Sequence, residues 1–225
     1  MNRISDKTKF KQNRGTGFGA DYKPWILPNE FNSQGTASYY PDWKHGRMIT
    51  LLSQAERAVY LHLRWDDRNL DIREQFPLNY DVTTYIAQEL GFRTVRNSDM
   101  QTNIMTTDFL VSTAAGPYAV SVTHRRKDFE KTKRVKEKTM IEQKYWESIG
   151  IPFLRISRED INEMEVANIS DVVPFYDSKF IYDDFSKARH LIATKRIIVD
   201  MTKPIDYEAL ITELKEDTIW QQKLY

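Results

Sequence analysis

Two neighbouring segments decide the fold of this 225-residue chain: Met105-Thr106-Thr107-Asp108-Phe109-Leu110-Val111 and Tyr118-Ala119-Val120-Ser121-Val122-Thr123. Both are rich in apolar and β-branched residues, and the turn dipeptide Gly116-Pro117 lies between them. They therefore predict two adjacent β-strands. The first strand carries one acid, Asp108, near its middle. Because a buried carboxylate is costly without a partner, an acid at this position indicates a functional site.

The rest of the chain alternates between helical and extended patterns. Helices are predicted over residues 53–65, 82–90, 129–149, 181–193 and 207–214. Strands outside the central pair are predicted over residues 69–78, 151–156 and 196–201. This order predicts an α/β core, followed after about residue 170 by a short C-terminal α/β extension.

The chain divides into three predicted regions. Residues 1–46 form a basic N-terminal arm, whose scattered aromatic side chains favour burial or stacking. Residues 47–168 form the core that carries the strand pair. Residues 169–225 form a C-terminal extension or a small subdomain.

Composition limits the classes of protein to which the chain can belong. Hydrophobic residues make up 40% of the chain and aromatic residues 12%, which is enough for a core and excludes a wholly disordered protein. No apolar run approaches about eighteen residues, so no membrane span is expected, and the polar N-terminus is unlike a secretory signal. The absence of cysteine excludes disulfides and fits a reducing cytoplasm.

Any metal site in this chain would use oxygen ligands. No cysteine is present, and the four histidines, His45, His62, His124 and His190, show no HExxH-like spacing. Oxygen ligands favour Mg²⁺, with Mn²⁺ as the second choice.

Positive charge is concentrated in two segments of a chain whose net charge is only +1. Residues 1–14 and residues 124–146 are both rich in Lys and Arg. They suggest contact with a polyanion such as nucleic acid. A solvated helix face and a loose tail would explain the same charge equally well.

Acids occupy three positions where the pattern expects apolar residues: Glu56, Asp108 and Glu142. A shared divalent ion would satisfy them, but each has a structural alternative. Glu56 completes Ser53-Gln54-Ala55-Glu56, a capping box in which it would bond to the start of its helix. Asp108 could pair with a nearby Arg or Lys, and Glu142 could form a salt bridge with Lys138.

Alternation along paired strands would place Asp108 on the same face as Ser121 and Thr123. A site built there has one acid, two hydroxyls and, as a further oxygen ligand, the backbone carbonyl of Val122. In phosphodiester hydrolysis, a lysine at such a site orients or activates the attacking water. The second strand supplies no lysine. The cations just beyond it are His124, Arg125 and Lys127.

These residues give the chain a resemblance to TnsA, the family of endonuclease subunits of heteromeric, Tns-type transposases. The matching blocks are residues 15–25, 51–56, 70–77, 105–111 and 134–146, in the order of the family. The blocks Asp71-Ile72-Arg73-Glu74-Gln75-Phe76-Pro77 and Thr106-Thr107-Asp108-Phe109-Leu110 are the most specific. The resemblance covers residues 15–160 and fades beyond residue 170.

The resemblance implies a restriction-endonuclease-like core of the PD-(D/E)xK type, in which helices flank a mixed central sheet. It also implies a Mg²⁺-dependent cut at the 5′ ends of a transposon during cut-and-paste excision, while the transposase TnsB cuts the 3′ ends. The expected partners are transposon-end double-stranded DNA, TnsB and the ATPase regulator TnsC, with no membrane. The expected location is the bacterial cytoplasm, in association with the nucleoid.

The resemblance also assigns roles by position. Glu56 matches the helix acid of the family, and Asp108 matches its central metal-binding acid. Ser121 stands where the family has a glutamine or another residue, and Thr123 stands where it has the catalytic lysine. The metal ligands implied are Glu56, Asp108, Ser121 and Val122, and the catalytic residues are Glu56, Asp108, Ser121, Thr123 and Lys127. DNA contacts are expected from Arg125, Arg126, Lys131, Lys133 and Arg134.

Three hypotheses follow for the function. The first is an active Mg²⁺ nuclease in which a displaced basic residue replaces the lysine missing at Thr123. The second is a catalytically impaired subunit that acts in DNA binding and transpososome assembly. The third is a stand-alone restriction or repair nuclease.

Overall fold

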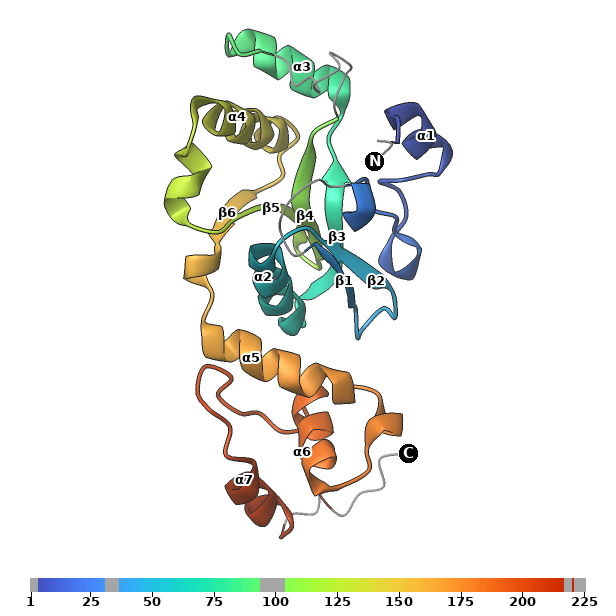
Figure 1. Cartoon of the computed structure of the whole chain (residues 1–225), viewed down its shortest axis with the longest axis vertical. Helices are drawn as coiled ribbons and strands as arrows, with labels where there is room; N and C mark the ends of the chain where they lie inside the picture. The colour runs from blue at the N-terminus through green and yellow to red at the C-terminus, as the bar shows by residue number, and fades with distance from the viewer. Residues whose placement is uncertain (1–3, 31–36, 94–103, 217–219, 221–225) are drawn as a thin grey trace. The chain divides into compact units, whose positions relative to one another are not determined.

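The two predicted strands are present at the centre of a four-stranded sheet, β4 (Thr106–Thr113) and β5 (Gly116–Thr123). Figure 1 shows the computed structural model, which describes residues 4–30, 37–93, 104–216 and 220. Parts of the predicted arm (1–3 and 31–36), core (94–103) and extension (217–219 and 221–225) lie outside these residues. The chain divides into two compact units, 1–160 and 161–225. The predicted boundary between residues 168 and 169 falls inside a helix of the second unit.

The sheet is mixed, as predicted. Its strand order is β3-β4-β5-β6, with β3 at Asn69–Pro77 and β6 at Phe153–Ser157. The first three strands are antiparallel, whereas β6 runs parallel to β5. Because a long crossover must join parallel neighbours, the chain between β5 and β6 holds a 3-10 turn, η3 (Arg126–Glu130), and α4 (Lys133–Ser148).

Helices cover both faces of this sheet. Phe109 and Leu110 are consecutive in β4, so their side chains point to opposite faces. Tyr60 of α2 (Gln54–Trp65) packs against Phe109, with ring centroids 6.3 Å apart. Leu110 belongs to a buried cluster with Ile141 of α4 and Ile86 of α3 (Tyr80–Glu89). The predicted α/β core is therefore confirmed, with α2 and α4 on opposite faces.

The predicted helix over residues 129–149 begins later than expected. α4 starts at Lys133, because the side chain of Thr132 accepts a hydrogen bond from the backbone of Val135 and caps the helix there. Gly150 follows the helix with a φ of 71°, a left-handed backbone that is typical of a glycine just beyond a helix end.

The N-terminal segment packs against β3. Its aromatic residues Tyr22 and Trp25 are buried, as expected of an ordered arm. The Tyr22 hydroxyl donates to the carbonyl of Glu74 at 3.0 Å, and the Trp25 amide donates to the carbonyl of Gln75 at 3.2 Å. Gly15 has a φ of 75°, and a Cβ atom there would lie 2.2 Å from Pro77 Cγ, so only glycine permits this approach.

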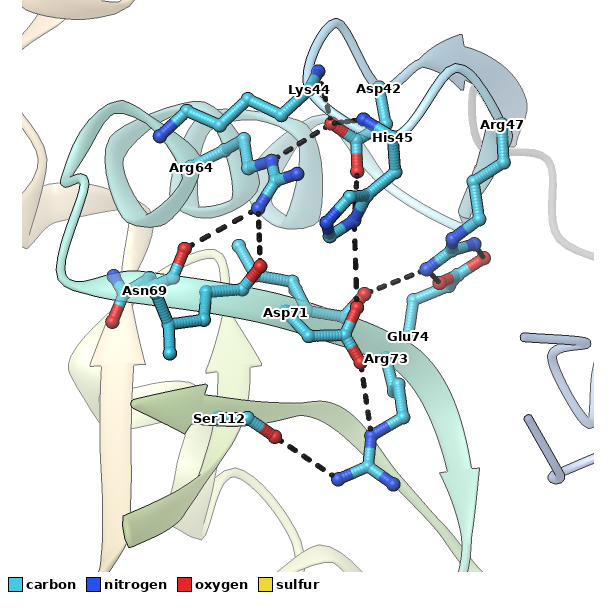
Figure 2. A network of polar contacts seen from close by, with 12 residues as sticks. Asp42, Lys44, His45, Arg47, Arg64, Asn69, Asp71, Arg73, Glu74 and Ser112 are labelled. Carbon is cyan, nitrogen blue, oxygen red and sulfur yellow. Dashed lines mark hydrogen bonds and ion pairs between the residues drawn. The ribbon is translucent and has the colours of Figure 1, made fainter. Parts of the chain in front are cut away.

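A buried network of ion pairs joins a small two-stranded sheet to β3 and α2 (Figure 2). The small sheet consists of β1 (Ser38–Pro41) and β2 (Met48–Leu51). Arg47 donates to both carboxylate oxygens of Glu74, at 2.9 and 2.7 Å, and Arg64 donates to Asp42 at 2.8 Å. Asp71 lies 3.5 Å from Arg73.

The second unit is helical in its described residues. It contains α5 (Glu163–Val172), α6 (Asp184–Ala193) and α7 (Tyr207–Leu214), and residues of α6 and α7 share a buried cluster with Trp220. The strand predicted over residues 196–201 is absent, so the extension is not α/β as expected. The amide of Asn168 donates to the carbonyls of Met201 and Lys203, and these bonds hold the segment in a loop instead. No described helix is long and apolar enough to cross a membrane.

We expect Arg47→Met to lower the free energy of unfolding by about 3–5 kcal/mol, because it leaves the buried Glu74 carboxylate unpaired. Chemical denaturation measures the loss. Adding Glu74→Gln should recover much of it, since the uncompensated charge is then gone. Lys179→Met, which breaks an exposed pair with Asp177, is the control and should cost less than about 1 kcal/mol. A similarly small loss for Arg47→Met would contradict the role given to the Arg47–Glu74 pair.

Candidate active site

Glu56 lies at the start of α2, where it also serves the helix end. Ser53 Oγ accepts from the backbone of Glu56 at 3.1 Å and donates to Glu56 Oε1 at 3.1 Å. Glu56 Oε2 accepts from the backbone of Leu52 at 2.9 Å. The capping interaction considered from the sequence is therefore present. It does not use all of the carboxylate, which is buried and also faces β3.

Asp108 is held by neutral donors. Its Oδ2 accepts from the backbone amide of Val122 at 2.6 Å, and its Oδ1 faces the side-chain nitrogen of Gln75 at 3.5 Å. Within the described residues Asp108 has no ion pair with Lys or Arg, so the predicted structural alternative for this acid is wrong. The register of β4 and β5, in which Leu110 faces Ala119, puts Asp108 opposite Ser121 as the sequence predicted.

Gln75 of β3 joins the two acids, a role that no sequence pattern predicts. Its Nε2 donates to Glu56 Oε2 at 3.3 Å and lies 3.5 Å from Asp108 Oδ1. A single amide nitrogen therefore sits between the two carboxylates.

Glu142 reaches the same region from α4. It is buried, and its carboxylate accepts hydrogen bonds from the hydroxyls of Thr107 and Ser121. No described contact pairs it with Lys138, so the predicted salt bridge is wrong. The position of Glu142 in the apolar stripe of this helix nevertheless indicates a polar site correctly.

The electrostatics of the site follow from these contacts. Burial, and then repulsion by the Asp108 carboxylate, raise the pKa of Glu56 to about 8. Burial likewise raises the pKa of Asp108 to about 6. Burial, and then repulsion by Asp108, raise the pKa of Glu142 to about 8. The pKa values of all three acids are raised because burial disfavours their charged forms. A bound cation would stabilise the ionised carboxylates, so the site favours cation binding.

The donor set fits a hard divalent ion with few protein ligands. No group of three or more acidic or histidine side chains is arranged to hold a metal ion in the described part of the chain. Mg²⁺ commonly takes only one or two carboxylates, and water and phosphate oxygens complete its coordination. Glu56 and Asp108 provide such a pair. The hydroxyl of Ser121 is engaged by Glu142, and a ligand role for Ser121 or the Val122 carbonyl stays a prediction.

The cation nearest to the end of β5 in the sheet register is Arg155, and not Lys127 as expected. Lys127 lies exposed on η3, and no described contact brings it to Asp108 or Glu56. Arg155 of β6 pairs with Ser121 in the sheet register, while Thr123 pairs with Ser157. Paired residues share a face of the sheet, so Arg155 projects on the same face as Ser121. Its guanidinium lies 5.6 Å from the centre of the Phe129 ring. The position of Arg155 beside Ser121 follows from the pairing of β5 with β6 and cannot be read from the sequence.

The predicted DNA-binding residues lie on η3, immediately before and after it, and in the first turn of α4. Arg126 pairs with Asp160, Arg125 lies 3.8 Å from Asp128, and Arg134 donates to Glu137. Lys131 and Lys133 are exposed, with no described ion pair. These two lysines therefore present the most available positive charge of the set.

Comparison with known proteins agrees with the resemblance noted in the sequence. Residues 66–158 match the family described as TnsA-like endonuclease N terminal. Over 164 residues, the chain is 36% identical to Transposon Tn7 transposition protein TnsA of Escherichia coli. That match covers 72% of this chain and 59% of the relative, so the chain spans less than two thirds of the relative's length. Asp108, Ser121, Glu142 and Arg155 lie inside the family match, whereas Glu56 precedes it.

The raised pKa values predict a pH dependence for the metal-free protein. A carboxyl whose pKa is higher in the folded than in the unfolded state binds its proton more tightly when folded, so stability falls as pH rises between the two values. In EDTA, the free energy of unfolding should therefore fall between about pH 5 and pH 8, by more than about 1 kcal/mol. Glu142→Gln should reduce this fall, and Glu147→Gln, on the exposed side of α4, should not. An unchanged slope in Glu142→Gln would contradict the assignment.

Proposed function

We propose, on the premise that residues 66–158 belong to the TnsA-like N-terminal endonuclease family, that this chain is the DNA-cutting subunit of a transposase. Its reaction is Mg²⁺-dependent phosphodiester hydrolysis at the 5′ ends of the transposon during cut-and-paste excision. The partners are transposon-end DNA, a TnsB-type transposase and a TnsC-type ATPase.

The paired carboxylates of Glu56 and Asp108 carry this proposal. They face one point from two different elements, and their hydrogen-bond donors within the described ranges are all neutral. These two residues would hold the ion, and Mg²⁺ bound there supplies a Lewis acid that activates water and offsets phosphate charge. The backbone amide of Val122 fixes the direction of the Asp108 carboxylate. Thr107 and Ser121 fix Glu142, which remains largely protonated near neutral pH in the metal-free protein.

Arg155 takes the charge-stabilising part of the role of the missing lysine. A guanidinium binds phosphate oxygens in a planar fork and stays protonated, so it offsets charge at a phosphate but does not act as a base. Both Arg155 and Lys127 are exposed, so the assignment to Arg155 rests on its register beside Ser121. Lys131 and Lys133 provide phosphate contacts that position the DNA without reading its sequence.

The second candidate function is a catalytically impaired subunit that binds DNA and assembles the transpososome. The observation in its favour is Thr123, because a hydroxyl replaces the ammonium expected from the family. Loss of one charge-stabilising group costs about 100- to 1000-fold in rate in other enzymes.

Cutting assays with the partner transposase, transposon-end DNA and Mg²⁺ separate these functions. We expect wild type to give 5′ nicks and Asp108→Asn to reduce them by more than about 100-fold. Arg155→Gln should reduce cutting more than Lys127→Gln, and Lys144→Gln, exposed on α4, is the control. If wild type and Asp108→Asn give the same products while Thr123→Lys gains cutting, the impaired subunit is the correct function.

DNA affinity should depend on salt through Lys131, just before α4, and Lys133, the first residue of α4. For the double variant Lys131→Gln/Lys133→Gln, we expect the slope of log affinity against log salt to become shallower by about 1–2, with the same loss on all sequences. Fluorescence anisotropy over a salt series measures this slope. Lys203→Gln in the second unit is the matched control. Equal slopes for wild type and the double variant would remove both lysines from the DNA interface.

A further inference from the structure

We infer that Gln75 is a reversible ligand of the metal site, whose side-chain amide turns over when a divalent ion binds between Glu56 and Asp108. Nε2 faces the carboxylates without the ion, and Oε1 faces the ion when it is present. The inference rests on the proposed function, because it needs the metal site described there.

The backbone of Gln75 is unusual for a strand residue. Its φ is 48°, in the left-handed region, and its side chain is only 2% exposed. A residue with a Cβ atom pays about 1–2 kcal/mol for this conformation, so its neighbours must enforce it. The Trp25 amide binds the carbonyl of Gln75, and the Tyr22 hydroxyl binds the carbonyl of Glu74. A strained backbone that the N-terminal segment holds in place beside a cluster of acids points to a functional side chain.

Without an ion, the amide nitrogen suits the two acids. Its N–H groups point toward Glu56 Oε2 and Asp108 Oδ1, at 3.3 and 3.5 Å. Both distances are at the long end for hydrogen bonds, so one nitrogen serves two acceptors without a tight bond to either. A divalent ion between these carboxylates would be repelled by the N–H hydrogens, and the nitrogen is no ligand because its lone pair is delocalised into the carbonyl group.

Turning the amide over removes this conflict with little other movement. Rotation by about half a turn about the last side-chain bond exchanges Oε1 and Nε2, and a neutral carbonyl oxygen is a suitable ligand for Mg²⁺. The other end of the amide remains satisfied, because its partner is the hydroxyl of Thr106, 3.2 Å from Oε1. A hydroxyl both donates and accepts, so it pairs with either orientation.

The amide from β3 also compensates for β5. Ser121 stands where the second strand is expected to provide a ligand, but Glu142 engages its hydroxyl. The Oε1 atom of Gln75 then gives the site a third ligand residue beside Glu56 and Asp108.

Metal titration of the whole chain without DNA tests the inference. Free Mn²⁺, followed by electron paramagnetic resonance, should bind Gln75→Leu about 10- to 100-fold more weakly than wild type. Gln75→Glu should retain affinity, because a carboxylate keeps an oxygen ligand and lacks only the N–H groups. Gln88→Leu, an exposed glutamine on α3, should bind as wild type does.

A second measurement follows the amide directly. The side-chain N–H signals of Gln75, identified by their loss in Gln75→Glu, should shift on Mg²⁺ addition in ¹⁵N-labelled wild type. This measurement decides the question if Gln75→Leu does not fold. Unmoved Gln75 signals at saturating Mg²⁺, or wild-type Mn²⁺ affinity in Gln75→Leu, would overturn the inference.

Asp108→Asn distinguishes the two levels of failure. If Asp108→Asn loses Mn²⁺ binding while Gln75→Leu keeps it, the metal site stands and only the role of Gln75 falls. If Asp108→Asn binds Mn²⁺ as wild type does, the metal site itself is wrong, and the inference falls with it.

Discussion

The fixed position of residues 74 and 75 in β3 is the constraint on which the rest of the first unit depends. Arg47 donates two hydrogen bonds to the Glu74 carboxylate, and the Thr50 amide donates a third. The N-terminal segment binds both backbone carbonyls. Because residues 47–50 and the N-terminal segment both bind these two residues, an N-terminal arm that is remote in sequence supports the centre of the site.

Buried acids in this unit fall into two groups with opposite surroundings. In the network of Figure 2, Asp42, Asp71 and Glu74 each lie within ion-pair distance of an arginine. In the site, the partners of Glu56 and Asp108 among the described residues are amides and a hydroxyl. Charge that is matched inside the protein holds the fold together. A buried carboxylate without such a partner must bind a proton or a cation from outside the protein. Glu56 and Asp108 are therefore candidates for a functional site.

The sequence predicted what local patterns control and missed what strand pairing and packing control. Apolar patterning and the Gly116-Pro117 turn are sufficient to predict the central strands and the helices around them. The segment 196–201 has the composition of a strand, but hydrogen bonds from Asn168 hold it as a loop. Gln75 and Arg155 were missed as site residues because only the pairing of β3 with β4, and of β5 with β6, brings them beside Asp108 and Ser121. Glu142 was noticed for its place in the stripe, but its partner was wrong because the helix neighbour Lys138 was considered before the facing sheet.

The double use of Glu56 affects how evolutionary loss of activity can be recognised. This acid binds Ser53 and Leu52 at the start of α2, so its replacement harms the helix whether or not the protein cuts DNA. A lineage that had abandoned catalysis would still be under selection to keep it. Asp108 caps no helix, and among the described residues its buried carboxylate has neutral partners alone, the Val122 amide and Gln75, so its pKa is raised. Among related chains, retention of Asp108 therefore records continued use of the site, whereas retention of Glu56 records only a stable helix.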